Sequence, residues 1–222
     1  MQNERTKTMV TLAMIAALAY LLMWAIRIPV FAMPPLKYEP KDVAITIAGF
    51  IFGPVSAFLV SLVVSLVEMV TVSETGWIGA VMNLVSTCSF ACTAAFLYKK
   101  NHTLKGAIIA LVSGIVGMVI VMLLWNYILT PIYMGYPRDA VVALLPTVFL
   151  PFNLLKGVLN AAFIMLLYKP LVITLRKAGL VSPSTTVTQE GGSHKISPGV
   201  LLISAALIIT CILIILALTG KI

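Results

Sequence analysis

Lys156 has the clearest chemical potential in this sequence, because it lies inside a long apolar segment. A lysine at the centre of a membrane helix costs roughly 2.5 to 3.5 kcal/mol on insertion scales, and less near the interface. Asn153 lies three residues earlier and Asn160 four residues later, so all three side chains share one helix face. An ammonium group that reaches the interface is one interpretation. The stripe favours another, in which this face borders a polar cavity.

Two further polar side chains, Glu68 and Asn83, lie in other apolar segments, where each is costly unless it finds a partner or water. Glu68 fits either ligand contact or a structural ion pair, and Asn83 fits either ligand contact or a hydrogen bond between helices. Ala13 and Ala17 form a small-xxx-small pair in the first apolar segment. Such a pair lets helices approach closely, inside one bundle or against another membrane protein.

Sequence motifs for catalysis are missing. The chain has no G-x-x-x-x-G-K-[ST] loop, no H-E-x-x-H and no G-x-S-x-G. Its two histidines and three cysteines show neither metal-ligand spacing nor a disulfide framework. We therefore expect a binding protein and not an enzyme, with no cofactor and no metal, that leaves ATP hydrolysis to another chain. A proton- or sodium-coupled carrier has little support, because the sequence places only one carboxylate within a membrane segment and shows no internal repeat.

The segments that hold these side chains are expected to be membrane helices. Of the 222 residues, 61% are hydrophobic and 10% are charged, against roughly 25% charged in soluble domains. Apolar runs of about 18 to 25 residues recur, each long enough to cross a hydrocarbon core of roughly 30 Å. We expect an all-α integral membrane protein with seven spans, at about residues 9–30, 43–53, 55–72, 77–98, 106–129, 152–175 and 199–218.

The spans divide unequally along the chain. The first six form one membrane domain, residues 1–177, and a polar cytoplasmic linker, residues 178–198, leads to an additional transmembrane helix, residues 199–219. The basic residues behind the formal charge of +8 are scattered over short loops. They form no patch that could bind nucleic acid, and they indicate instead how the chain is oriented in the membrane. The positive-inside rule places the N-terminus of this multi-pass cell-membrane protein in the cytoplasm. The polar loops at about residues 36–42 and 130–150 then lie outside and form the candidate mouth of a site.

Four motifs together resemble one known family, the riboflavin-specific substrate-binding (S) components of energy-coupling factor (ECF) transporters. They are Leu36-Lys37-Tyr38-Glu39-Pro40-Lys41-Asp42, Ala48-Gly49-Phe50-Ile51-Phe52-Gly53-Pro54, Gly79-Ala80-Val81-Met82-Asn83 and Leu150-Pro151-Phe152-Asn153-Leu154-Leu155-Lys156-Gly157. The resemblance covers about residues 8–176. It implies a six-helix S-component bundle that takes riboflavin from outside, and the seventh span departs from that pattern.

The resemblance also implies roles for single residues. Asn153 and Lys156 match the family positions that hydrogen-bond the flavin, while Leu36, Tyr38 and Asn83 would line the pocket. An Ala-x-x-x-Ala on the first helix docks on the transmembrane coupling subunit in this family, which would place Ala13 and Ala17 at a partner interface. That subunit and two ATPases would drive uptake. Riboflavin would then be transported cargo and not a cofactor.

Three alternatives stay open on the sequence. An S component for thiamine, folate or a queuosine precursor would share the fold but not the Asn153 and Lys156 pair. A membrane enzyme of lipid-linked substrates would show clustered acidic or histidine ligands, and none is visible. A structural membrane scaffold would not need polar side chains at positions 153 and 156, where they are costly.

Overall fold

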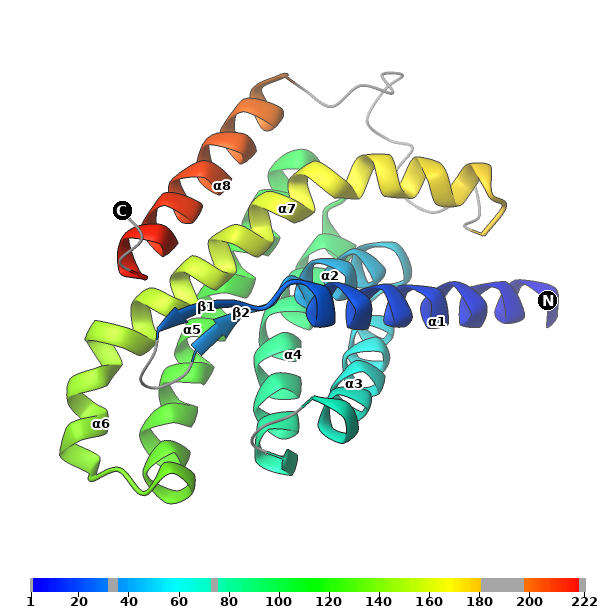
Figure 1. Ribbon diagram of the computed structural model, residues 1–222. Helices are drawn as coiled ribbons and strands as arrows, with labels where there is room; N and C mark the ends of the chain where they lie inside the picture. Colours follow the sequence, from blue (N-terminus) through cyan, green and yellow to red (C-terminus); the bar gives the residue numbers. More distant parts are fainter. Residues whose placement is uncertain (1, 32–35, 73–75, 181–197, 220–222) are drawn as a thin grey trace.

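Eight α-helices, one π-helical turn and a two-stranded hairpin make up the described part of the chain (Figure 1). The structure is a computed structural model that describes residues 2–31, 36–72, 76–180 and 198–219. In chain order the elements are α1 (Gln2–Ala25), β1 (Ile28–Phe31), β2 (Leu36–Tyr38), α2 (Lys41–Phe52), α3 (Pro54–Thr71), α4 (Gly76–Lys100), α5 (Leu104–Met134), α6 (Arg138–Leu144), η1 (Leu145–Phe149), α7 (Leu150–Lys177) and α8 (Pro198–Leu218).

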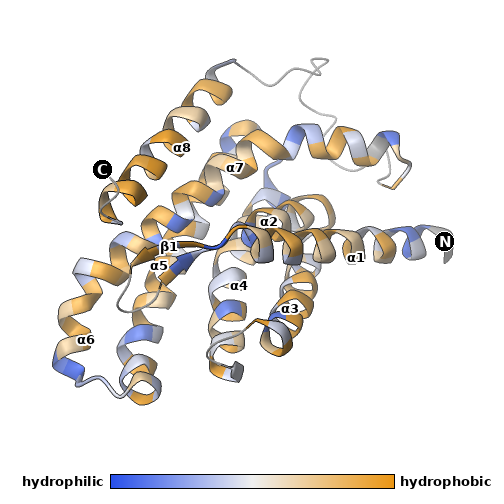
Figure 2. Ribbon diagram, in the orientation of Figure 1, coloured by the Kyte–Doolittle hydropathy of each residue, from blue (hydrophilic) through white to orange (hydrophobic). Residues whose placement is uncertain are grey.

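Six helical segments of the described chain are long and apolar enough to cross a membrane. They are α1, α3, α4, α5, the continuous run of α6, η1 and α7, and α8. Apolar residues run along the outside of these helices (Figure 2), and side chains such as Val55 and Val70 are exposed over 70% and 79% of their surface. Because lipid solvates such faces, the fold is the expected all-α membrane bundle.

Helix α2 corresponds to the predicted second span, but it has only 12 residues. At 1.5 Å per residue such a helix covers about 18 Å, less than a hydrocarbon core. Eleven of its residues are buried, and it packs against α1, α3, α4 and α7. The short helix therefore forms the centre of the bundle, and the lipid-facing surface belongs to its neighbours.

The Gly53-Pro54 turn after α2 is confirmed. Gly53 has a φ of +97°, which favours glycine, and Pro54 occupies the first turn of α3, where its missing N–H is tolerated. The first span, by contrast, ends earlier than predicted: α1 ends at Ala25, and residues 28–30 belong to strand β1, where Pro29 disfavours a helix. Strand β1 pairs antiparallel with β2, and Ile28 lies opposite Tyr38.

The loop predicted at residues 130–150 is mostly helical, so that prediction is wrong. Helix α5 continues through Pro131 to Met134, and a new helix begins at Arg138. Only residues 135–137 lie outside the helices, with Gly135 in the left-handed region. Proline is tolerated inside membrane helices because neighbouring helices and local π geometry satisfy the freed backbone groups, and a π-helical turn does occur at Leu145–Phe149.

Helix α8 returns along the bundle and packs against α7 and β1. Its buried residues Cys211 and Ile215 share an apolar cluster with Val30, Tyr38 and Leu159. Most of the predicted linker, residues 181–197, lies outside the described residues, so the division into a six-helix domain, a linker and an extra helix stays a prediction.

Gly49→Ala is expected to lower the free energy of unfolding by roughly 1 to 3 kcal/mol, because overpacking displaces neighbouring helices. A Cβ on Gly49 would lie 2.9 Å from the Cβ atoms of both Ala57 and Ala95. Gly117→Ala is the matched control, since its nearest contact would be the Ser89 carbonyl oxygen at 3.4 Å. Thermal melting in detergent checks the difference, and equal melting temperatures for the two variants would contradict it.

Candidate functional site

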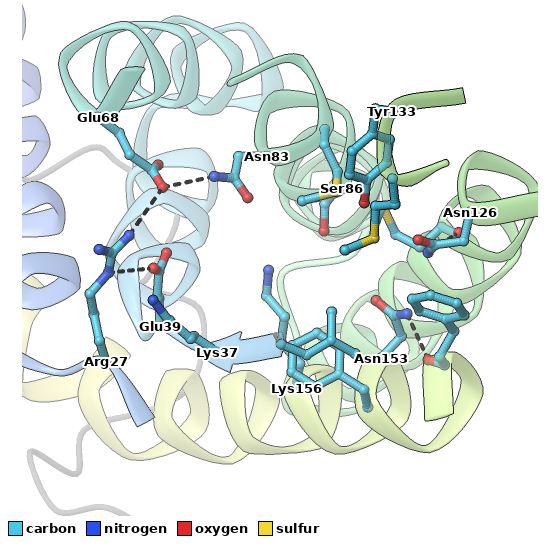
Figure 3. Close-up of a pocket in the computed structure, with 16 residues that line it drawn as sticks. Arg27, Lys37, Glu39, Glu68, Asn83, Ser86, Asn126, Tyr133, Asn153 and Lys156 are labelled. Atoms are coloured by element: carbon cyan, nitrogen blue, oxygen red, sulfur yellow. Dashed lines mark hydrogen bonds and ion pairs between the residues drawn. The ribbon is translucent and has the colours of Figure 1, made fainter. Parts of the chain in front are cut away.

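A cavity of about 160 Å³ lies among the hairpin and helices α3, α4, α5 and α7 (Figure 3). Glu68, Asn83, Tyr133 and Asn153 line it, so it occupies the end of the bundle where α3 and α5 finish and α4 and α7 begin. Much of the remaining wall is apolar and comes from Leu36, Met82, Met122, Met134, Phe149 and Phe152. Both predicted mouth segments, residues 36–42 and 130–150, thus contribute to one cavity.

Four of the five predicted ligand-binding residues, Leu36, Asn83, Asn153 and Lys156, line this cavity. They come from β2, α4 and α7. The fifth residue, Tyr38, is not part of the cavity wall, unlike its predicted position. It is 2% exposed and donates a hydrogen bond from its hydroxyl to Asn160 Oδ1 at 3.0 Å.

Asp42 organises a buried polar network behind the wall. Its Oδ2 lies 3.0 Å from Lys156 Nζ and accepts a hydrogen bond from Asn160 Nδ2 at 3.3 Å. Its Oδ1 accepts a second from Thr87 Oγ1 at 2.6 Å. Burial raises the pKa of the Tyr38 hydroxyl, which keeps that group protonated as the donor to Asn160. The network therefore links the hairpin, α2, α4 and α7.

A second charged network also borders the cavity, and Figure 3 shows its members Arg27, Glu39, Glu68 and Asn83. Glu39 pairs with Arg27 at 2.8 Å and with Lys41 at 3.1 Å. Glu68 pairs with Lys41 and accepts a hydrogen bond from Asn83 Nδ2 at 2.8 Å. The structural ion pair that was one interpretation of Glu68 is thus present, and Glu68 also lines the cavity. The two networks hold three cations and three carboxylates, so their formal charges cancel.

The side-chain oxygen of Asn153 is a hydrogen-bond acceptor in the cavity wall. Its Nδ2 donates to the Phe149 carbonyl oxygen at 2.7 Å, one turn earlier in the chain. The described residues provide no hydrogen-bond donor to Asn153 Oδ1, which leaves this oxygen available to an N–H group of a ligand.

Asn126 and Arg27 are wall residues that the sequence analysis missed. Asn126 is 3% exposed, donates to Met122 and accepts from Thr130. It is an asparagine within an apolar segment, as Asn83 is, and the same argument could have found it. Arg27 follows the last turn of α1, where a basic residue looks like an ordinary interfacial anchor.

Ala13 and Ala17 lie on the exposed side of α1. Ile15, Ala16 and Ala19 face the bundle and are buried. The small-xxx-small pair is therefore not used for packing among the residues that the structure describes. Among the described residues, no three His, Cys, Asp or Glu side chains come together as a metal site.

Comparisons with known proteins agree with this geometry. The chain is 30% identical to the riboflavin transporter RibU of Staphylococcus aureus over 181 residues, 78% of this chain and 95% of the relative. It is 29% identical to the riboflavin transporter FmnP of Bacillus subtilis over 187 residues, 78% of this chain and 98% of the relative. A solved S component of a bacterial ECF transporter superposes with a TM-score of 0.67 at 29% identity, over 78% of this chain and 99% of that one.

The family model for the ECF transporter substrate-specific component matches residues 7–168, which include the hairpin, the central helix α2 and every wall residue of the cavity. Helix α8 lies beyond this match. The chain therefore belongs to the substrate-specific components of ECF transporters, a family of membrane transport subunits and not of enzymes.

Proposed function

We propose that this chain binds riboflavin as the substrate-specificity subunit of an ATP-driven ECF vitamin uptake transporter. The observation that carries the proposal is the meeting of Leu36, Asn83, Asn153 and Lys156 around one cavity, although they come from three separate elements. Relatives in several bacteria bear the name riboflavin transporter. No observation favours thiamine, folate or a queuosine precursor over riboflavin.

The wall chemistry suits a flavin. An isoalloxazine ring is planar and largely apolar, and the phenylalanine, leucine and methionine side chains of the wall offer it a matching surface. Its carbonyl oxygens need donors, which the Lys156 ammonium supplies, and its imide N–H needs an acceptor such as Asn153 Oδ1. The hydroxylated tail needs polar partners, and Asn83, Ser86 and Asn126 line the same space.

The orientation in the membrane follows from charge. Lys99, Lys100 and Lys105 lie where α4 ends and α5 begins, at the opposite end of the bundle from the cavity. If this basic end faces the cytoplasm, the N-terminus is cytoplasmic and the cavity opens outward. The exposed Ala13 and Ala17 face of α1 would then dock on the transmembrane coupling subunit, to which two ATPases supply energy.

Titration of riboflavin into the purified chain tests the ligand directly. We expect flavin fluorescence to be quenched at micromolar concentrations or below, without any partner subunit, because the cavity is built within one chain. Thiamine and biotin are the control vitamins, and neither should compete. No quenching by riboflavin together with clear binding of thiamine or biotin would overturn the proposed ligand.

Asn153→Ala is expected to weaken riboflavin binding by roughly 5- to 150-fold, because an unpaired buried ligand group costs about 1 to 3 kcal/mol. The substitution removes the free acceptor on the wall and leaves the ion pairs intact. Asn101→Ala, in the exposed turn after α4, is the matched control and should keep the affinity. An unchanged dissociation constant on monodisperse Asn153→Ala protein would remove Asn153 from the site.

A further inference from the structure

Helix α8 lies beyond the region that matches the family, residues 7–168, yet it packs against two elements of the candidate site. These are α7, which carries Asn153 and Lys156, and strand β1 of the hairpin. The buried residues of α8, Ser204, Cys211 and Ile215, share one face of the helix. The helix contains no charged residue, so it acts on its neighbours by packing.

The hairpin depends on such packing. Its strands have four and three residues, and a two-stranded sheet is marginally stable at best by itself. Val30 of β1 and Tyr38 of β2 are each 2% exposed, and they share an apolar cluster with Cys211 and Ile215. Helix α8 therefore helps to fix the position of the Tyr38 ring.

Polar contacts lead from that ring to the cavity. The Tyr38 hydroxyl donates to Asn160 Oδ1 at 3.0 Å, and Asn160 Nδ2 donates to Asp42 Oδ2 at 3.3 Å. The same oxygen of Asp42 lies 3.0 Å from Lys156 Nζ. Asn160 and Asp42 are both 0% exposed, so a lost contact would leave a buried polar group unpaired. Lys156 is the member of this series that lines the cavity.

We propose that α8 is a positioning helix for ligand binding, which holds Tyr38 so that Asn160 and Asp42 fix the Lys156 ammonium in the cavity wall. This inference rests on the proposed riboflavin function, in which that ammonium donates to ring carbonyl oxygens. A lysine has a flexible four-carbon stem and loses conformational freedom when a ligand orders it. A support that orders the stem beforehand lowers this cost and tightens binding.

The test truncates the buried face of α8 in the full chain, as Cys211→Ala/Ile215→Ala. We expect the riboflavin dissociation constant in detergent to rise about fivefold, because the Lys156 stem is then less ordered before binding. Ile209→Ala/Leu213→Ala is the matched control, with the same spacing on the same helix, and its residues are 59% and 50% exposed. The control should keep the wild-type dissociation constant.

Tyr38→Phe separates positioning from support of the fold. It keeps the aromatic ring beside α8 and removes the hydroxyl that donates to Asn160. By itself it should also raise the dissociation constant about fivefold. In this background the double substitution on α8 should still lower the melting temperature, because its packing is still lost. It should change the dissociation constant less than about twofold, because the series of contacts is already broken.

Three results would overturn the inference: a wild-type dissociation constant in either folded variant, Tyr38→Phe or the α8 double variant, or an α8 effect of equal size in both backgrounds. The last would assign the effect to packing behind Phe152, a wall residue in the same cluster. If the double variant does not fold, Ile215→Ala alone takes its place in both backgrounds. Failure of the wild-type chain to bind riboflavin would instead refute the proposed function.

Discussion

Lys156→Met is expected to reduce riboflavin affinity and stability together. The missing donor leaves a ligand group unpaired, which costs about 1 to 3 kcal/mol, or roughly 5- to 150-fold in the dissociation constant. The same substitution leaves Asp42 buried without its cation. Removing one partner of a buried ion pair typically costs about 3 to 5 kcal/mol of folding free energy. We therefore expect a clear drop in melting temperature beside the loss of binding.

Binding and melting are measured on the same monodisperse preparation in detergent. Lys105→Met is the matched control, because Lys105 is exposed at the far end of the bundle. Had Lys156 simply reached the interface, its replacement would remove an insertion cost and leave both properties intact. Unchanged affinity in a folded Lys156→Met variant would exclude Lys156 from the ligand site even if the melting temperature falls.

Ala17→Trp and Ala13→Trp are expected to abolish riboflavin uptake in cells that supply the coupling subunit and ATPases. A bulky indole ring on the exposed side of α1 would prevent close approach of a partner helix. Riboflavin binding by the purified variants should stay at the wild-type level, because these positions face away from the buried core of the bundle. The measurements are uptake of labelled riboflavin in cells and fluorescence titration in detergent.

Ile209→Trp is the matched control for this pair. Ile209 is 59% exposed on α8, outside the region that matches the family. A tryptophan there should leave uptake unchanged. If both alanine variants lose binding as strongly as uptake, the alanines support the bundle itself, and if uptake persists, the coupling subunit docks elsewhere.

The helices were predictable because membrane crossing requires long apolar runs, and the Gly53-Pro54 turn was predictable because its two residues restrict the backbone. The continuation of the helix through Pro131 was not predictable. Proline usually ends a helix in water, but α5 continues through it among other helices. The hairpin was also missed, since the strand residues 28–31 and 36–38 form short runs that resemble a helix end and a loop.

The spacing of polar residues along one helix identified one side of the site from the sequence. The other side depends on contacts between residues far apart in the chain. Asn153, Lys156 and Asn160 share a helix face at fixed intervals, so the sequence alone could group them. Their partner Asp42 lies more than a hundred positions away along the chain, and a single sequence carries no signal for such a contact. Tyr38 was assigned to the pocket wall from the family resemblance, and its contact with Asn160, on a distant part of the chain, could not be predicted either.

The return path of α8 determines where the two ends of the described chain lie. The Thr11 hydroxyl of α1 donates to the Leu180 carbonyl oxygen at 3.4 Å, so the start of α1 lies beside the end of α7. Cys211 and Ile215, near the end of α8, pack instead against Val30 of the hairpin, at the cavity end. Figure 1 shows the two ends well apart. If α8 spans the membrane as predicted, labels placed beside Gln2 and Leu218 are expected to report opposite aqueous compartments.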